Sequence, residues 1–276
     1  MNTLTNSALQ TKFEEVKNLR PNFYQINDII NWDSIADLFP ERKETRGAPE
    51  YDKKLMLKIL FLQSCYSISD EEMEYQIKDR FSFQEFLGFP EYIPDYTTIR
   101  RFREELTEEN TIELIWSELQ NQIKSKGIVI EKGMIQDAKF ITADPGKTNS
   151  GMSGRGQAAK TSRSRDGSWT KKGKKSIFGF KMHNKVCKKN KIICEMGIST
   201  ARVHDGRIDL ANPDEITYRD RGYSGCPTKV KGNATMKRGK LSIYDKLRNK
   251  RITKQRCRGE HPYGTMTRSF KADIQN

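Results

Sequence analysis

Cysteine is scarce in this chain, and its spacing excludes the common zinc motifs. The five cysteines are odd in number and include no CxxC pair. Cys187 and Cys194 are separated by six residues, which is not a zinc-finger spacing, and two adjacent strands explain them better. We therefore expect reduced thiols in a cytoplasmic protein.

Long hydrophobic runs are also missing. The longest apolar run, Leu55 to Leu62, is interrupted by Lys58 and is too short to span a bilayer. The first residues show no basic-then-apolar signal for export. The sequence thus predicts a protein without a membrane segment that stays inside the cell.

Acidic residues are few in the second half of the chain. The formal net charge of +14 divides into −7 over residues 1–133 and +21 over residues 134–276. Residues 145–190 hold thirteen Lys or Arg and one acid, and residues 229–258 hold twelve and one. Because neutralising DNA phosphates releases counterions, these segments favour nucleic acid as a partner. A solvated surface is the simpler alternative, and a membrane surface is disfavoured because no amphipathic helix with an aromatic face accompanies these runs.

Helical periodicity dominates residues 1–127. Apolar residues recur at i, i+4, i+7 and i+11 from Leu55 to Tyr66, as in a helix that buries one stripe. Ser69 followed by Glu72 forms a capping box that starts the next helix, and Gly127 ends the last one. The sequence predicts an N-terminal helical domain over this range.

Three arginines mark one of these helices as a candidate DNA reader. Arg100, Arg101 and Arg103 face outward on a helix that begins near Pro94, after a short helix and a tight turn. This arrangement fits a helix-turn-helix that enters a DNA groove. An ordinary bundle with an exposed basic face explains it equally well, because this half of the chain is acidic.

After Ile128 the hydrophobic period changes to that of strands. Strands are expected over Met134–Ile141, Ile177–Cys187 and Ile192–Ser199, followed by a helix over Gly206–Ala211 and a strand ending at Asp220. This order is that of a ribonuclease-H-like domain. Residues 145–175 are rich in Gly, Ser, Lys and Arg and are expected to form a basic, disordered loop. The predicted fold class is α+β, with a helical DNA-binding domain (1–127) before a ribonuclease-H-like α/β catalytic domain (128–276).

Three carboxylates in the basic half are candidate metal ligands. Asp137 lies on the first expected strand, Asp220 at a strand tip before the turn at Gly222, and Glu260 on a later helix. Two divalent cations about 3.5–4 Å apart can activate water and neutralise the leaving oxygen of a phosphodiester, and hard cations prefer carboxylate oxygens. A solvated turn residue is the alternative for Asp220. The rival acids are Asp144, Asp166 and Asp205, of which Asp205 is more simply a helix N-cap.

Several motifs together carry a family resemblance. They are MIQDAKFI around Asp137, the Trp169–His183 stretch, the T-x-x-x-V-H-D element of Thr200–Asp205, D-x-G-Y at Asp220–Tyr223, and R-x-x-x-E formed by Arg256 and Glu260. With the helical segment from Tyr51 and the PDYTTIRRFREEL motif, they make the chain resemble a DDE transposase of the insertion-sequence-five family, within the insertion-sequence-four group. The resemblance extends from about Tyr51 to Arg268.

The resemblance implies a reaction, a cofactor and a set of partners. A relative of this kind binds the terminal inverted repeats of its element as double-stranded DNA, cuts at the repeats, and joins the ends to target DNA. It works as a homodimer on DNA, at the nucleoid in the cytoplasm, with two Mg²⁺ ions or Mn²⁺ in their place. Asp137, Asp220 and Glu260 would bind the metal.

The same resemblance suggests residues that contact DNA. Arg256 would hold a phosphate or the side chain of Glu260, and Lys181 and His183 would touch the DNA backbone. A surface position for Lys181 and a packing role for His183 are equally compatible with the sequence. Tyr223 is either a core residue or a platform for a base.

The chain departs from the family pattern near its end. Thr253 and Thr267 stand where relatives carry a Tyr and a Lys, with Arg268 and Lys271 as substitutes, and sixteen residues follow Glu260. A C-terminally shortened copy is expected from this. The alternative function is therefore a catalytically inactive, decayed copy that acts only as a DNA-binding protein.

Overall fold

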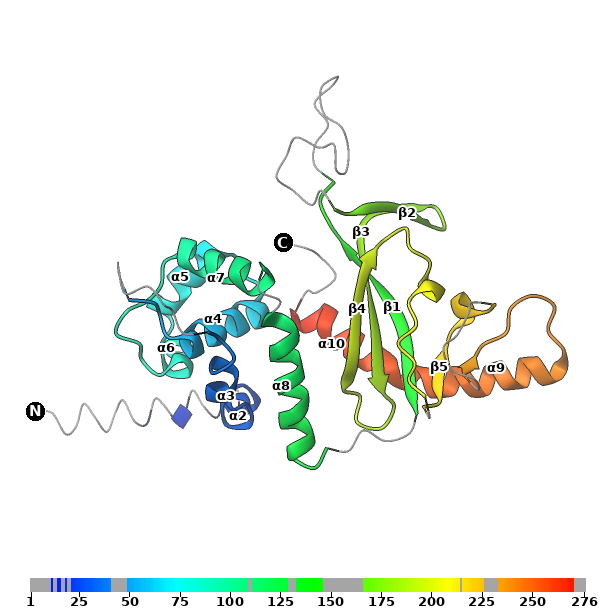
Figure 1. The fold of residues 1–276 in the computed structure, drawn as a ribbon, viewed down its shortest axis with the longest axis horizontal. Helices are drawn as coiled ribbons and strands as arrows, with labels where there is room; N and C mark the ends of the chain where they lie inside the picture. Colours follow the sequence, from blue (N-terminus) through cyan, green and yellow to red (C-terminus); the bar gives the residue numbers. More distant parts are fainter. Residues whose placement is uncertain are drawn as a thin grey trace, which may run out of the picture. The chain divides into compact units, whose positions relative to one another are not determined.

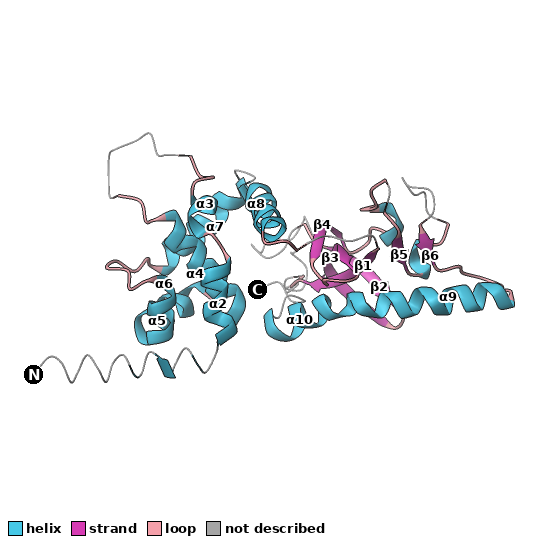
Figure 2. Ribbon diagram, turned by 90° about the horizontal axis from the view of Figure 1, so that it is seen from below, coloured by secondary structure: helices cyan, strands magenta, loops and turns pink. Residues whose placement is uncertain are grey.

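The computed structural model contains two compact units, Met1–Gly127 and Ile128–Asn276. The residues described are 11, 14–15, 18, 21–40, 49–108, 111–128, 133–145, 166–213, 215–225 and 233–270 (Figure 1). Helices dominate the first unit, and the second combines a mixed sheet with helices (Figure 2). Among these residues, no helix combines the length and the apolar character needed to cross a bilayer.

The first unit is built from short helices with side-chain caps. Its helices are α2 (Pro21–Ile29), α3 (Trp32–Ala36), α4 (Lys53–Tyr66), α5 (Asp70–Asp79), α6 (Phe81–Leu87), α7 (Tyr96–Glu108) and α8 (Thr111–Ser125). The side chains of Asn31, Asp52 and Ser69 accept backbone N–H groups at the starts of α3, α4 and α5. Such caps satisfy donors that the helix itself leaves unpaired.

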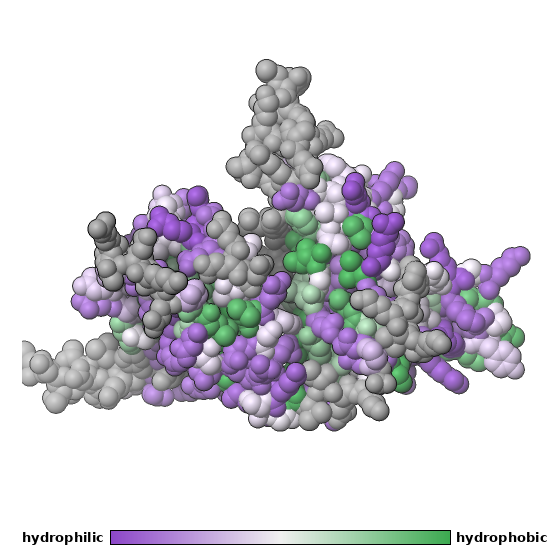
Figure 3. Space-filling view, viewed as in Figure 1, coloured by the Kyte–Doolittle hydropathy of each residue, from purple (hydrophilic) through white to green (hydrophobic). Residues whose placement is uncertain are grey.

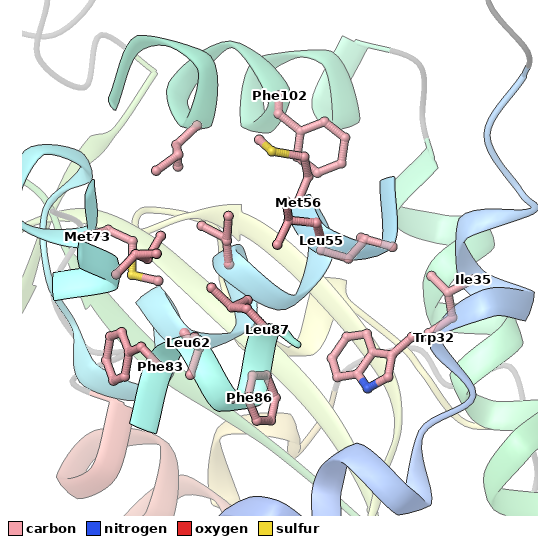
Figure 4. Close-up of a cluster of buried hydrophobic side chains, with 14 of the residues drawn as sticks. Trp32, Ile35, Leu55, Met56, Leu62, Met73, Phe83, Phe86, Leu87 and Phe102 are labelled. Carbon is pink, nitrogen blue, oxygen red and sulfur yellow. The ribbon is translucent and has the colours of Figure 1, made fainter. Parts of the chain in front are cut away.

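Aromatic and aliphatic side chains from separate helices form the core of this unit (Figure 4). Ile59 and Leu62 of α4 are fully buried, as the periodicity of that segment predicts. Trp32 meets the ring of Phe86 edge-on, with the ring centroids 6.3 Å apart. Burial of this kind is the main favourable term in folding, so α4 organises the unit.

The second unit is a mixed sheet. Its strands are β1 (Met134–Thr142), β2 (Ser168–Lys172), β3 (Lys175–Cys187), β4 (Ile193–Thr200), β5 (Thr217–Arg219) and β6 (Ala234–Thr235). Their order is β2-β3-β1-β5-β6, and β4 also pairs with β3. The β1–β3, β2–β3 and β3–β4 pairs are antiparallel, whereas β1–β5 and β5–β6 are parallel. The expected strands around Asp137, before Cys187 and before Asp220 are all present.

A helical path packs on this sheet after β6. It consists of α9 (Ile243–Arg256), the 3₁₀ turn η4 (Cys257–Gly259) and α10 (Glu260–Phe270), which run end to end (Figure 2). A side chain on Gly259 would place its Cβ 2.6 Å from Ile135 of β1. Glycine at this position therefore allows the backbone of the path to lie directly against the sheet.

Two expectations need correction. The expected loop over residues 145–175 is too long, because its last part forms β2, where Trp169 packs against Phe178 with ring centroids 5.4 Å apart. Gly173, with φ of +61°, supplies the turn that joins β2 to β3. Residues 146–165 of that loop lie outside the described residues. The helix expected over Gly206–Ala211 is wrong, since only one 3₁₀ turn, η2 (Asp205–Arg207), forms there.

Gly179 of β3 is a point where only glycine fits. Its φ is +142°, and a Cβ atom would lie 2.1 Å from the carbonyl oxygen of Ile141 on β1. We expect Gly179→Ala to weaken the β1–β3 pair by about 3 kcal/mol or more, because it combines backbone strain with a clash. Hydrogen–deuterium exchange should then accelerate in β1 and β3 and remain unchanged in α4 and α7.

Gly264→Ala in α10 is the matched control. No atom lies within 4 Å of its added Cβ, and alanine favours a helix over glycine by about 1 kcal/mol. Its exchange should be unchanged or slower. Equal acceleration in both variants would contradict the close approach of β3 to β1.

Candidate active site

Two aspartates occupy equivalent positions on neighbouring parallel strands. In the β1–β5 pair, Ile135 lies opposite Tyr218, and Asp137 and Asp220 each follow two residues later. Asp220 continues β5 with an extended backbone at φ −79° and ψ −175°. Side chains two residues apart point to the same face, and adjacent strands lie about 4.8 Å apart. The two carboxylates therefore project side by side from the same face.

Electrostatics agree with this placement. Burial raises the pKa of the Asp137 carboxyl, the Arg256 guanidinium opposes that shift, and the charge of Asp220 adds to it. Because a neighbouring negative charge raises the pKa of the Asp137 carboxyl, a cation between the two carboxylates would be favoured. Asp137 and Asp220 thus form an acidic pair.

The pair is held by bonds from the helical path. Arg256 donates from Nη2 to Oδ2 of Asp137 at 2.8 Å, while the backbone N–H of Ala138 donates to Oδ1 at 3.0 Å. The hydroxyl of Tyr263 donates to the backbone oxygen of Asp137 at 2.7 Å. Arg256 and Tyr263 are seven residues apart and lie on one side of the path, so Asp137 accepts a hydrogen bond from each of them.

A tight turn fixes Asp220. The N–H of Gly222 donates to Oδ1 of Asp220 at 2.8 Å. A Cβ on Gly222 would lie 2.9 Å from that oxygen and 3.7 Å from Oδ2 of Asp205. Glycine leaves this space open, and the carboxylate of Asp205 faces the same turn as that of Asp220.

Lys181 holds Asp205 in this position. Its Nζ donates to Oδ1 of Asp205 at 2.8 Å and to the backbone oxygen of Val203 at 2.7 Å. The interpretation of Asp205 as an N-cap is wrong, because the ring of His204 caps η2 by accepting the N–H of Gly206. Lys181 is buried, and its ammonium group forms an ion pair with Asp205 inside the unit.

Two tyrosines, the buried Tyr223 and the half-buried Tyr263, line the acidic pair. Burial raises the pKa of the Tyr223 hydroxyl strongly, and the charges of Asp205, Asp137 and Asp220 add to the shift. The pKa of Tyr263 is raised in the same way, by burial first and then by Asp137. Both phenols are neutral at physiological pH. Tyr223 is a core residue, since only 2% of it is exposed.

Glu260 stands apart from the pair. It is the first residue of α10 and is exposed, beside an open pocket lined by Cys257, His261, Gly264, Thr265 and Arg268. Arg256 and Glu260 are four residues apart, which on a continuous α-helix would place them on one face, but the three residues of η4 lie between them. A 3₁₀ step turns the chain by more than an α-helical step does, so Glu260 is shifted from the face that Arg256 occupies.

Among the described residues, no three His, Cys, Asp or Glu side chains lie close enough to hold a metal ion. The structure brings together Asp137 and Asp220, with Asp205 and Arg256 beside them, and leaves Glu260 outside. The chemistry of the pair nevertheless fits a divalent cation. Carboxylate oxygens are the ligands that hard cations prefer, and each can accept more than the one bond it makes here.

Most of the residues predicted to contact DNA have partners within the protein. Arg103 pairs with Asp70, and Arg100 lies 3.4 Å from Glu104. Arg101 is exposed at a pocket of the first unit. His183 is fully buried, and its Nε2 shares a hydrogen bond of 2.8 Å with the hydroxyl of Ser199. Contact of these residues with DNA stays a prediction.

Sequence reasoning missed two residues of this site. Tyr263 follows Arg256 by seven residues, two helical turns, so helical spacing alone indicates that both face Asp137. Asp205 was recognised as an acid but given a local role. Its pairing with Lys181 has no sequence signal, because 24 residues separate the two.

The Arg256–Asp137 bond generates a prediction about proton affinity. Because the folded state raises the pKa of Asp137, this carboxyl stabilises the fold at acidic pH and loses that contribution as the pH rises through its folded-state pKa. Arg256→Gln removes the cation that opposes the shift, so the pKa of Asp137 should rise further. Carbon-13 NMR titration of the Asp137 carboxyl measures it.

Arg258→Gln is the control, since Arg258 is exposed and lies two residues further along the path. It should leave the titration of Asp137 unchanged. An unaltered pKa in the Arg256 variant would contradict the ion pair.

Comparison with known families agrees with this site. Residues 12–105 match the family described as "Transposase domain (DUF772)". Residues 131–275, more than half of the chain and including Asp137, Asp220 and Glu260, match the family described as "Transposase DDE domain". No solved structure matches the chain significantly. The chain therefore belongs to the DDE transposases, enzymes of DNA transposition carried by mobile elements.

Proposed function

We propose that this transposase belongs to the insertion-sequence-five family and that it cuts and joins DNA at the terminal inverted repeats of its element. The observation that carries the proposal is the side-by-side placement of Asp137 and Asp220 on β1 and β5. A mixed sheet with an acidic pair on its central strands supports a ribonuclease-H-like fold for residues 128–276.

Asp137 and Asp220 are the proposed ligands of a divalent cation, Mg²⁺ or Mn²⁺, with Glu260 as the third. When bound, such a cation lowers the pKa of a water molecule and neutralises charge on a phosphate oxygen. Arg256 then has two tasks, to orient Asp137 through the bond at Oδ2 and to keep positive charge beside the phosphate. Tyr263 fixes the backbone of β1 at Asp137.

The partner is double-stranded DNA, both the repeats and the target. The charge of +21 on residues 134–276 supports this, because phosphate contacts dominate the affinity of proteins for DNA. The helical unit, residues 1–127, is the proposed reader of the repeats. Joining two ends calls for a homodimer on DNA, and the proposed place of action is the nucleoid.

Cleavage should depend on the acidic pair. We expect Asp137→Asn to lower nicking of a repeat-bearing duplex in Mg²⁺ on the order of 10³-fold or more, because the variant loses a charged ligand while keeping its shape. Gel-shift binding of the same duplex should be unchanged. Asp166→Asn, at an exposed position before β2, is the control and should nick normally. Loss of binding in the Asp137 variant would show a structural role instead.

The third ligand can be identified by a pair of variants. Glu260→Gln should abolish nicking, because the family resemblance makes Glu260 a ligand. Asp205→Asn should retain measurable nicking, because its carboxylate is already neutralised by Lys181. Iron-induced cleavage of the polypeptide, with Fe²⁺ in place of Mg²⁺, locates the cation independently of activity. The reverse order of defects would move the third ligand from Glu260 to Asp205.

A second candidate function is a DNA-binding protein without catalysis. The exposed position of Glu260, away from Asp137 and Asp220, favours it. This candidate predicts repeat binding with no nicking in Mg²⁺ or Mn²⁺. Nicking by the purified chain that disappears with EDTA and returns with Mg²⁺ would exclude it.

A further inference from the structure

The outer face of α9 carries basic side chains that have no acidic partner among the described residues. One side of α9 is engaged with the rest of its unit through Arg248, Asn249, Ile252 and Arg256. Arg248 donates to the backbone oxygen of Thr235, and Asn249 bonds the backbone of Lys237 in both directions. Ile252 is buried. This inward side of the helix continues to Arg256 at the acidic pair.

The opposite side presents Lys250, Arg251 and Lys254 to solvent, with Lys246 beside them. Among the described residues, none of these four forms an ion pair or a side-chain hydrogen bond. The one acid in α9, Asp245, lies on the inward side, where it bonds Lys237 and Ser242. The outer face therefore has positive charge without a compensating carboxylate.

Several basic side chains elsewhere in the described residues are already paired with carboxylates. Lys181 is bound to Asp205, Arg256 to Asp137, and Arg103 to Asp70. A phosphate would have to displace a carboxylate to reach them. At the outer face of α9 no carboxylate has to be displaced, so a phosphate can pair directly with the basic side chains.

We propose that the outer face of α9, formed by Lys246, Lys250, Arg251 and Lys254, binds the phosphate backbone of duplex DNA. This rests on the proposed function and names a surface of the second unit that holds DNA. The same helix carries Arg256, which binds Asp137 from its inward side, so the proposed DNA surface and the acidic pair are connected through α9. The contact is independent of base sequence, since cations that reach phosphates carry no base information.

The arrangement of apolar and basic residues along α9 disfavours a membrane as the partner of this face. Ile243, Tyr244 and Leu247, on the first two turns of α9, are 75%, 84% and 50% exposed and form an apolar end of this helix. Figure 3 shows hydrophobic surface among the hydrophilic surface at the α9 end of the second unit. A helix that lies in a membrane interface has its apolar and basic residues on opposite sides along its whole length. Here the apolar end and the cations follow one another along the same side. Like charges also disfavour a second copy of the face as the partner.

The experiment is the salt dependence of DNA binding in EDTA, with a 30-base-pair duplex that lacks inverted repeats. The variant is Lys250→Ala, Arg251→Ala and Lys254→Ala together. Each phosphate contact contributes about 0.9 to the slope of log K against log salt concentration, so the slope should fall by about 2.7. Fluorescence anisotropy from about 50 to 200 mM KCl measures this.

The matched control is Lys171→Ala, Lys174→Ala and Lys175→Ala, which removes the same charge from exposed positions around the β2–β3 turn. Its slope should change less. Ile243→Ser with Leu247→Ser alters the apolar end without changing charge, and its slope should equal that of the unmodified chain. Equal slopes for the two triple variants, or failure of the unmodified chain to bind the duplex, would overturn the proposal.

A membrane arm uses vesicles of phosphatidylserine and phosphatidylcholine. A triple α9 variant that loses vesicle binding but keeps duplex binding would overturn the assignment to DNA. Because no metal is present, the result is separate from catalysis. If the α9 variant lowers the salt-dependence slope but the unmodified chain never nicks DNA, strand cutting alone is overturned. If the unmodified chain nicks DNA but the α9 variant leaves the salt-dependence slope unchanged, the α9 surface alone is overturned.

Discussion

The parallel pairing of β1 with β5 is the constraint on which the site depends. The two strands are about 80 residues apart in the chain, and between them come the antiparallel strands β2, β3 and β4. Pairing in register brings Asp137 and Asp220 to adjacent positions on one face. A shift of one residue in β5 would turn Asp220 to the other face and separate the two charges. Strand register therefore sets the geometry of the proposed cation site.

Two carboxylates placed side by side repel one another, and the rest of the unit offsets that repulsion. Arg256 supplies a cation at Asp137, Lys181 supplies one at Asp205, and the N–H of Gly222 stabilises Asp220. The two cations come from different elements, the half-buried Arg256 from α9 and the buried Lys181 from β3. Removing either would leave a partly buried carboxylate uncompensated, which is costly. Some of the basic residues in this half of the chain thus neutralise its own carboxylates, and others form the surface that we propose for DNA.

The helical path from α9 to α10 carries both a cation that neutralises Asp137 and the cations proposed to bind DNA. The inward side of the path contacts β1 through Gly259, Arg256 and Tyr263. The path and the sheet therefore pack against each other around Asp137. Its outward side carries the cations proposed to hold DNA. The η4 turn interrupts the helical period between Arg256 and Glu260, and short 3₁₀ stretches within helices often occur at functional positions. The orientation of Glu260 is set by this turn.

The sequence by itself determined the mixed fold class, the main strands around Asp137 and before Asp220, the α4 core stripe and the transposase family. These follow from local periodicity, caps and motifs, which are properties of short segments. It did not reveal β2, because that strand depends on the contact of Trp169 with Phe178, and it placed a helix after His204 where one turn forms. Tertiary structure alone decided that Lys181 neutralises Asp205, that Arg256 binds Asp137, and that Glu260 faces solvent. These outcomes depend on packing between residues far apart in the chain, and a pattern within one segment carries no information about the partner that a side chain meets across the fold.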